Sequence, residues 1–383
     1  MTKLYKNIVI GGGASGLMLC ANLKNKQDTL LIEHNSKLGA KILISGGGRC
    51  NYTNAKVNAG DFLAKKSFVK EVFAQYNNIF IDNYFREKGL NRVVKNESQY
   101  FCKNGANELL DILKQEIQGV EVSLNSSVLG LKKDGNIFEV ITNKGSFFAK
   151  RVIVASGGLS FSKVGASDIG YKIAKEFGHT VKSLAPALVG FTLQPKESFF
   201  KELSGVSVDV DLKVARKRFS GSLLFAHKGI SGPVVLNASL FWSKGSIEVD
   251  FLPNFEIESI LNSSKSISNL LPLPKRVALA FLDRLNIKDK SANRLTLQEI
   301  EELREIKKYT FAPAGTFGYS KAEVTKGGIS LEEINSSSFE SKLVDNLYFL
   351  GEVLDVTGRL GGFNFTFAFA SALVCAKYLN NSS

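Results

Sequence analysis

A glycine pattern close to the N-terminus is the feature that most constrains the fold. The apolar run Ile8–Ile10 is strand-like and is followed at once by Gly11, Gly13 and Gly16, after which the apolar spacing becomes helical. In such a Gly-x-Gly-x-x-Gly unit the first glycine permits a tight turn, the second lets a pyrophosphate approach, and the third lets helix and strand pack closely. The positive end of the helix then faces the phosphates. The segment predicts a Rossmann-like α/β domain that binds a dinucleotide.

An acidic residue at the end of the next apolar run supports this interpretation. The run TLLIE ends at Glu33, at about the 20-residue distance where a carboxylate hydrogen-bonds the ribose of a dinucleotide. A glutamate favours an unphosphorylated adenosine ribose, and therefore FAD or NAD rather than NADP. The alternative, a glycine-rich turn in an unrelated α/β protein, leaves this spacing unexplained.

A second glycine run lies in the segment ISGGGRCNYTN. Ordering three consecutive glycines costs conformational entropy, so Gly46, Gly47 and Gly48 need a reason to be held in place. Their N–H groups can lie against a flat ring or a phosphate. Arg49 can neutralise a pyrophosphate or a substrate carboxylate, and Asn51 can donate or accept a hydrogen bond. A merely flexible loop, which is the alternative, has no need of Arg-Cys-Asn directly after the glycines.

Two later segments favour a flavin over a nicotinamide as the tightly held group. Residues 120–154 are strand-like with turn signals at KDG and NKG, and they predict a small meander leading into RVIVASGG. Near the C-terminus a strand-like run at 347–350 is followed by Gly351, Glu352 and a glycine-rich loop. Flavin folds use this order to hold the ribityl chain and to place a helix N-terminus at the pyrimidine edge of the ring. We therefore expect FAD.

The phenylalanines after this loop give conflicting signals. Phe363, Phe365, Phe367 and Phe369 alternate, which on period alone predicts a strand, whereas the following ASALVCAKYL is helical in character. We expect a buried helix that begins near Asn364, with its phenylalanines in the core.

Charge and length narrow the choice of function without deciding it. The chain has 383 residues, and 49 Lys and Arg against 36 Asp and Glu give a net charge of +13. Such an excess attracts nucleic acids or anionic cofactors. The basic residues are spread along the sequence, so charge alone does not predict a nucleic-acid-binding protein. The length predicts more than one structural unit.

Cysteine spacing and hydropathy give further expectations. The four cysteines form no C-x-x-C pair and the three histidines show no zinc spacing, so we expect free thiols and no metal site. No apolar run is long enough to span a membrane, and the N-terminus lacks the pattern of a signal peptide. The sequence predicts a cytoplasmic protein.

Five blocks of the sequence stand out, at residues 33–54, Ala155–Phe191, Leu223–Ser239, Ala322–Ile334 and Gly351–Leu373. Taken in order, they resemble one family of bacterial flavoproteins, the BaiN-like or aminoacetone-oxidase-family NAD(P)/FAD-dependent oxidoreductases. The family usually has Thr where Ser156 stands, Tyr where Phe363 stands, and a Trp-containing segment at Phe365–Phe369. The last departure leaves the substrate preference open.

The resemblance implies a glutathione-reductase-type FAD-binding domain with two insertions. The FAD-binding domain would comprise residues 1–189 and 335–383. A small β-barrel would comprise residues 190–255 and 309–334, and a helical cap residues 256–308. Alternating runs such as VSVDVDLKVA, and the helix signals of LPLPKRVALAF and TLQEIEEL, are compatible with this division.

The patterns and the resemblance together predict a set of cofactor-binding residues. No second Gly-x-Gly-x-x-Gly unit follows, so a separate nicotinamide domain is not expected, and NAD(P)H would bind transiently as an electron donor. The predicted FAD-binding residues are Gly11, Gly13, Ala14, Ser15, Gly16, Glu33, His34, Lys41, Ser45, Gly46, Gly47, Gly48, Arg49, Asn51, Val128, Ala155, Ser156, Gly157, Gly351, Glu352, Gly361, Gly362, Phe363 and Asn364.

The predicted activity is that of an FAD-dependent oxidoreductase acting on a small organic substrate, either as an NAD(P)H-linked reductase or as an amine-oxidase-like enzyme. Two alternatives stay open: a flavin-dependent RNA-modifying enzyme, such as one acting on tRNA, and a non-catalytic flavin-binding module. His227 is a weak candidate for proton transfer. His179 is expected at a helix end, and Cys50 in packing, because no partner cysteine is close to it in sequence.

Overall fold

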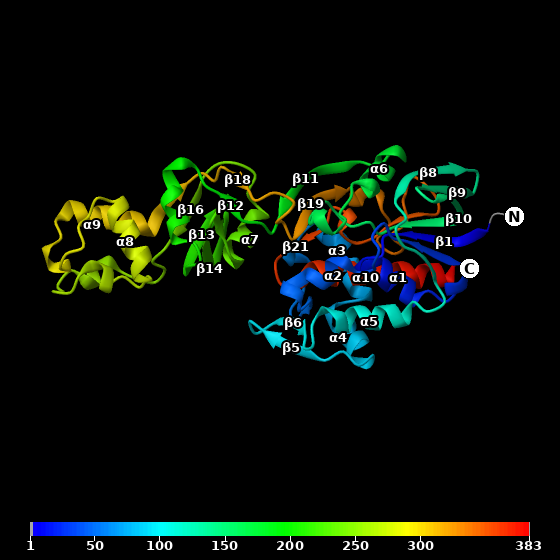
Figure 1. Cartoon of the computed structure of the whole chain (residues 1–383), viewed down its shortest axis with the longest axis horizontal. Coiled ribbons are helices and arrows are strands. Elements are labelled where there is room, and N and C mark those ends of the chain that lie inside the picture. Colours follow the sequence, from blue (N-terminus) through cyan, green and yellow to red (C-terminus); the bar gives the residue numbers. More distant parts are fainter. Residues whose placement is uncertain (1–2, 383) are drawn as a thin grey trace. The chain divides into compact units, whose positions relative to one another are not determined.

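The computed structural model describes residues 3–382, which divide into two compact units (Figure 1). The larger unit contains the chain up to residue 186 and again from residue 323, and the smaller unit comprises residues 187–322. The sequence predicts the return to the larger unit at residue 335, which is wrong. The chain returns earlier because β19 (Val324–Ile329) pairs with β11 (Val181–Ala187), the strand that precedes the insertion.

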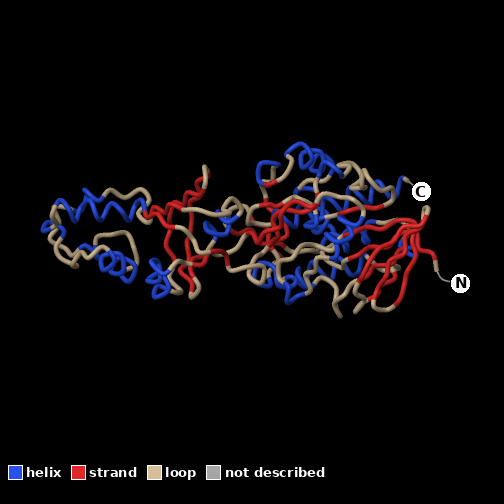
Figure 2. The backbone as a smooth tube through the Cα atoms, turned by 90° about the horizontal axis from the view of Figure 1, so that it is seen from above, coloured by secondary structure: helices blue, strands red, loops and turns tan. Residues whose placement is uncertain are grey.

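The central sheet of the larger unit has seven strands, which are β1 (Leu4–Ile10), β2 (Thr29–Ile32), β7 (Glu121–Ser123), β8 (Val128–Asp134), β9 (Ile137–Thr142), β10 (Gly145–Val154) and β20 (Leu347–Phe349). Their order is β7-β2-β1-β10-β9-β8, with β20 paired to β10. Figure 2 shows strands in red lying side by side near the N-terminus. β1 pairs in parallel with β2 and β10, and Ile8, Val9 and Ile10 at its C-terminal end are almost fully buried. Strands covered on both faces read as continuous apolar runs. The antiparallel β8–β9–β10 meander confirms the predicted one.

Two helices pack against each other beside β1, namely α1 (Ala14–Asn22) and α10 (Phe363–Asn381) (Figure 1). α10 begins next to the predicted start, and Phe363, Phe367 and Phe369 are buried while Phe365 is half-buried. A helix that is apolar all round is buried on all sides, and such a sequence can imitate the alternation of a strand. The predicted buried helix with core phenylalanines is confirmed.

Shorter elements complete the larger unit around the ends of the central strands. A three-stranded sheet has the order β3-β6-β5, and β21 pairs with β4. The elements are α2 (Ala40–Ile44), β3 (Asn51–Asn54), β4 (Phe62–Leu63), α3 (Lys66–Gln75), α4 (Asn78–Glu87), β5 (Arg92–Lys95), β6 (Gln99–Cys102), α5 (Ala106–Glu116), α6 (Ile169–Glu176) and β21 (Thr357–Gly358).

The smaller unit has its own sheet and its own core. Its strands are β12 (Phe191–Thr192), β13 (Ser207–Val214), β14 (Lys217–Ala226), β15 (Gly229–Ser231), β16 (Ile247–Asp250), β17 (Tyr309–Phe311) and β18 (Gly315–Thr316), in the order β17-β16-β13-β14-β15-β12-β18. Burial alternates strictly along β13, as expected for a sheet with one covered face. A closed barrel stays a prediction.

The helices of the smaller unit are α7 (Pro233–Ser239), α8 (Lys275–Arg284) and α9 (Leu297–Arg304). α9 begins with the predicted capping box, in which Thr296 Oγ1 accepts from the Glu299 amide and Glu299 Oε2 accepts from the Thr296 amide. The position of these helices as a cap stays a prediction. Across residues 3–382, none of the helices combines the length and the apolar character needed to cross a bilayer.

Candidate dinucleotide site

The three N-terminal glycines lie in three different environments. A Cβ at Gly16 would lie 1.9 Å from the Gly11 carbonyl oxygen, and one at Gly11 would lie 2.5 Å from the Ala155 carbonyl oxygen. The packing of α1 on the sheet therefore requires glycine at both positions. At Gly13 a Cβ would meet no atom within 4 Å from any other part of residues 3–382. Packing within the chain does not require glycine at Gly13, whereas close approach of a ligand would require it.

The N-terminus of α1 is free to bind an anion. Gly13 is its N-cap and offers no side chain, and the first turn, which includes Ala14 and Ser15, carries no acidic residue. The first N–H groups of a helix have no partner within the helix, and the helix dipole makes this end positive. The geometry fits a pyrophosphate group.

Glu33 directly follows β2 and holds the glycine turn in place. Its Oε2 accepts a hydrogen bond from the Gly12 amide at 2.8 Å, and its Oε1 accepts one from the Asn35 amide at 2.8 Å. His34 places Nδ1 3.2 Å from Glu33 Oε1. The Ser126 amide donates to the Glu33 carbonyl oxygen, which brings the start of β8 at Val128 to this corner. A carboxylate retains acceptor sites for ribose hydroxyls beyond these two bonds.

The second glycine run adopts a backbone that only glycine adopts easily. Gly46, Gly47 and Gly48 have φ values of 55°, 67° and 82°, three left-handed residues in succession. An ordinary L-residue pays about 1–2 kcal/mol at each such position. Apart from its chain neighbours, none of the residues described by the structure has an atom within 4 Å of a Cβ built at Gly47. Ser45 turns inward, and its Oγ donates to the Ile42 carbonyl oxygen at 2.7 Å.

The residues after this run have separate surroundings. Arg49 is exposed and lies over the ring of Phe101. Asn51 begins β3. In the amide orientation that satisfies both of its polar atoms, the side-chain oxygen accepts from the Gly362 amide at 3.3 Å and the side-chain nitrogen donates to the Thr53 carbonyl oxygen at 3.0 Å. The structure thus joins the glycine run to the start of α10.

The segment after β10 lies beside the N-terminal glycine turn. The Ala155 amide donates to the Ile10 carbonyl oxygen at 2.8 Å, and Gly157 has a φ of +73° with no protein atom within 4 Å of its Cβ position. Ser156 Oγ makes a long contact to the Gly157 carbonyl oxygen, at 3.5 Å. Gly13, Gly47 and Gly157 therefore share one property: each offers open space where a side chain would be.

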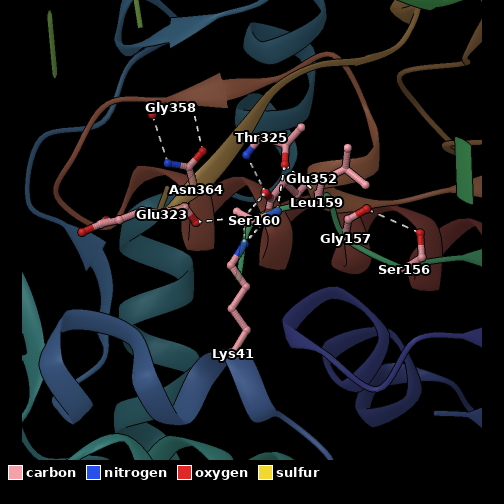
Figure 3. A network of polar contacts seen from close by, with 10 residues as sticks. All are labelled: Lys41, Ser156, Gly157, Leu159, Ser160, Glu323, Thr325, Glu352, Gly358 and Asn364. Atoms are coloured by element: carbon pink, nitrogen blue, oxygen red, sulfur yellow. Dashed lines mark hydrogen bonds and ion pairs between the residues drawn. The ribbon is translucent and has the colours of Figure 1, made fainter. Parts of the chain in front are cut away.

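A network of polar side chains ties four separate segments together (Figure 3). Lys41 of α2 donates to Glu352 Oε2 at 2.6 Å and to Ser160 Oγ at 2.7 Å. Glu352 Oε1 accepts from the Thr325 amide of β19 at 2.8 Å. Thr325 Oγ1 in turn accepts from the Leu159 amide at 2.7 Å. Lys41 and Glu352 were predicted to bind the cofactor, and the structure shows both holding loops.

The loop before α10 brings the remaining predicted residues together. Gly351 has a φ of +70° and packs against Ser15, whose Oγ would lie 2.2 Å from a Cβ there. Gly361 and Gly362 also have positive φ values, and Gly362 is the N-cap of α10, which has no capping side chain and no acidic residue in its first turn. Asn364 accepts from the Gly358 amide at 2.8 Å and donates to the Gly358 carbonyl oxygen at 3.0 Å (Figure 3).

Sequence reasoning missed the neighbour of Cys50. Cys102 lies beside it, because β3 and β6 pair, and the Cys102 amide donates to the Cys50 carbonyl oxygen at 3.2 Å. Both thiols are buried. A hydrogen bond to Cys50 and burial raise the pKa of the Cys102 thiol. The two residues are far apart in sequence, so no spacing motif could have revealed the pair.

The two histidines considered earlier have different surroundings. His179 follows α6, as predicted, and is buried, with Nε2 2.8 Å from Ser341 Oγ and Nδ1 3.2 Å from Glu333 Oε2. Burial lowers the pKa of His179, which the Glu333 carboxylate opposes. His227 is exposed in the turn between β14 and β15 of the smaller unit, and its catalytic role stays a prediction.

Known proteins resemble this chain over nearly its whole length. A family model described as "HI0933-like protein Rossmann domain" matches residues 5–378. Ribosomal RNA dihydrouridine synthases of Haemophilus influenzae and Escherichia coli are 38% and 37% identical, and 98% of each chain is covered in both cases. The 3-dehydro-bile acid delta(4,6)-reductase of Clostridium scindens is 28% identical over 96% of this chain and 97% of its own.

Solved structures share the fold. E. coli quinol fumarate reductase matches with a TM-score of 0.54 at 13% identity, covering 100% of this chain and 70% of that one. The apo form of the Mycobacterium smegmatis Sdh1 complex matches with a TM-score of 0.50 at 13% identity, covering 99% of this chain and 69% of that one. At such identities the likeness concerns the fold alone.

Proposed function

The chain belongs to the HI0933-like family of Rossmann-domain proteins, and from this premise we propose that it is an FAD-dependent oxidoreductase that saturates a carbon–carbon double bond conjugated to a carbonyl group. The proposal of FAD as the cofactor is supported by the open space at the Cβ positions of Gly13, Gly47 and Gly157. It is also supported by the N-termini of α1 and α10, which have no capping side chain. The reaction is supported by what the relatives' names share.

Those names describe one kind of chemistry. Making dihydrouridine saturates the ring double bond of uridine that is conjugated to a carbonyl, and a delta(4,6)-reductase of a 3-dehydro bile acid acts on double bonds conjugated to the 3-carbonyl. Both reactions add two hydrogens, one as a hydride and one as a proton. A bound flavin supplies hydride transfer, and NAD(P)H is the electron donor that we propose.

The chain's own residues would hold FAD at separate points. The start of α1 at Gly13 would face the pyrophosphate, and Glu33 would bind a ribose. The glycine run and the start of α10 would offer backbone N–H groups to the ring. The Lys41–Glu352 network would fix the loops between these points.

The proton requires a donor, and we propose Glu323. Its backbone carbonyl lies in the network of Figure 3, where it accepts from Ser160 Oγ at 3.2 Å. Its side chain is exposed to solvent on one side. Partial desolvation by the surrounding protein raises the pKa of its carboxyl, and the positive charge of Lys41 acts in the opposite direction. A carboxyl that stays protonated to higher pH can act as a general acid.

Two substrate classes fit this chemistry. A uracil base in ribosomal RNA has the support of the two relatives at 37–38% identity and of the net charge of +13. A small cyclic enone, closer to the small organic substrate expected from the sequence, has the support of the Clostridium scindens reductase at 28% identity. We take the uracil base as the working substrate.

The test combines a spectral titration with a product assay. The purified protein is titrated anaerobically with NADH and then NADPH, and the reduced protein is offered an unmodified ribosomal RNA fragment or a 3-oxo-delta(4) steroid. We expect bleaching of the flavin by one nucleotide, reoxidation by one substrate, and a product heavier by two hydrogens in mass spectrometry. A protein that purifies without flavin, or that neither substrate reoxidises, would contradict the proposal.

Glu323 has its own test within this assay. Glu323→Gln should slow substrate saturation by about 100-fold or more, as loss of a general acid does. The flavin content and the rate of bleaching by NAD(P)H should stay unchanged, because those steps need no proton from this residue. Equal loss of both half-reactions would show that the residue acts on the structure instead.

A further inference from the structure

Two cations lie over one aromatic ring at the edge of the glycine run. The guanidinium carbon of Arg49 is 5.6 Å, and the Nζ of Lys95 is 5.5 Å, from the centroid of the Phe101 ring. Arg49 comes directly after the glycines, and Lys95 ends β5 of the neighbouring hairpin. Two separate chain segments thus bring two positive charges within 5.6 Å of the centroid of one aromatic ring.

Neither cation has an acidic partner among residues 3–382, where the ion pairs involve other lysines and arginines. Arg92, which is on the same strand β5 as Lys95, differs because it has an acidic partner. It lies over Tyr100 at 3.9 Å and pairs with Asp82 Oδ1 at 3.1 Å. Two neighbouring charges of the same sign repel each other. The Arg49–Lys95 pair therefore favours an anion from outside the chain.

The pair borders the candidate dinucleotide site. A Cβ at Gly46 would lie 3.0 Å from a ring carbon of Phe101, so the ring lies directly against the glycine run. Gln99, which is on the same strand as Phe101, reaches within 3.2 Å of the Cβ position of Gly361 at the start of α10. An anion held by the pair would be held beside both glycine segments.

We propose that Arg49 and Lys95 form a phosphate-binding rim that holds the backbone of an RNA strand next to the site, an inference that rests on the uracil substrate of the proposed function. Arginine and lysine are the usual phosphate ligands in nucleic-acid complexes, and such contacts position the strand without reading its sequence. Phe101 is 7% exposed, so its ring holds the cations and is not available to stack on a base. Choice of the base must come from other residues.

The test compares two double variants with equal loss of charge. Arg49→Ala with Lys95→Ala removes the rim, and Lys132→Ala with Lys150→Ala removes two exposed lysines from β8 and β10. Affinity for a short fluorescein-labelled oligouridine is measured by anisotropy at several salt concentrations. Each lost phosphate contact reduces the magnitude of the negative slope of log K against log salt by about 0.7. The slope of the rim variant should therefore be smaller in magnitude than the wild-type slope by about 1.4. The control should keep the wild-type slope.

Three further readouts separate the possible failures. Arg49→Lys with Lys95→Arg keeps both charges and should keep the slope. If the rim variant loses flavin, the cations serve the cofactor and the inference is overturned. If the wild type forms dihydrouridine but the rim variant binds RNA with an unchanged slope, the inference fails while the proposed function stands. If the wild type neither binds nor modifies RNA, both the uracil substrate and the rim are overturned.

Discussion

At Gly47 the cost of a side chain to the backbone can be distinguished from its effect on a bound ligand. This glycine has a φ of +67° and no protein atom within 4 Å of its Cβ position, so a side chain would strain the backbone without striking the protein. We expect Gly47→Val to cost about 1–2 kcal/mol of unfolding free energy and to abolish flavin retention. The measurement is the flavin-to-protein absorbance ratio after purification, together with a thermal unfolding curve.

Gly89 provides a matched control for this substitution. It also has a left-handed φ, +91°, with no protein atom near its Cβ position, and it follows α4 away from the glycine run. Gly89→Val should cost a similar free energy and keep the flavin. Full flavin content in Gly47→Val would show that the run does not border the cofactor.

His179 makes stability depend on pH in a direction set by its burial. Its folded-state pKa lies below the ordinary value near 6.5, so the unfolded chain binds the proton first as the pH falls. Unfolding free energy is then fully present above about pH 6.5 and is lost below it. Calorimetry near pH 7.5 and pH 5 should show a smaller loss for His179→Gln than for the wild type. His227→Gln, at an exposed site, should behave as the wild type does.

At the scale of elements, the Lys41–Glu352 pair is expected to hold α2 against the loops of the site. Lys41→Ala removes two hydrogen bonds and leaves Glu352 half-buried beside the Thr325 amide. We expect a loss of about 1–2 kcal/mol, discounted because Lys41 is partly exposed. Urea unfolding followed by circular dichroism measures it. Lys65→Ala breaks an exposed pair with Glu332 and should leave the unfolding free energy almost unchanged, because solvent screens such pairs.

Sequence patterns predicted elements best where a local period or a local motif decided the structure. The strand–glycine–helix unit at Gly11 and the capping box at Thr296 are local, and both are present. The start of α10 was predicted against the period of its phenylalanines, because residues further along the helix gave the clearer signal. Contacts such as Cys50 with Cys102 depend on strand pairing, which no local pattern encodes.

At the scale of the whole molecule, the insertion has closely spaced ends. The Ser330 amide donates to the Thr180 carbonyl oxygen at 2.9 Å, and a Cβ at Gly327 would lie 2.2 Å from the Ser183 carbonyl oxygen. In both contacts the two residue numbers add up to the same value, as expected for antiparallel strands, and the same register brings residues 186 and 324 of the larger unit together. The sequence predicted an inserted domain but misplaced its far boundary, because β19 completes a sheet whose other strand lies more than a hundred residues earlier.

This spacing predicts that the larger unit folds alone. Replacing residues 187–322 by a short glycine–serine linker should leave a folded protein that keeps its flavin, because the core of the larger unit contains no residue from the insertion. We expect substrate turnover to be lost, because the deleted segment includes the predicted helical cap, residues 256–308. The flavin ratio and the product assay check the two statements separately. An insoluble or colourless product would contradict the first.

The separation of the two cores also decides which optical signal reports on which part of the chain. Trp242 is the single tryptophan of the sequence and lies in the smaller unit, where its ring is 5.1 Å from that of Phe191. Its emission therefore follows the smaller unit alone, while flavin emission would follow the larger one. Two units that melt independently need not give one transition. If tryptophan emission and flavin emission are recorded together during one unfolding experiment, they would show whether the two units unfold in a single step or one after the other.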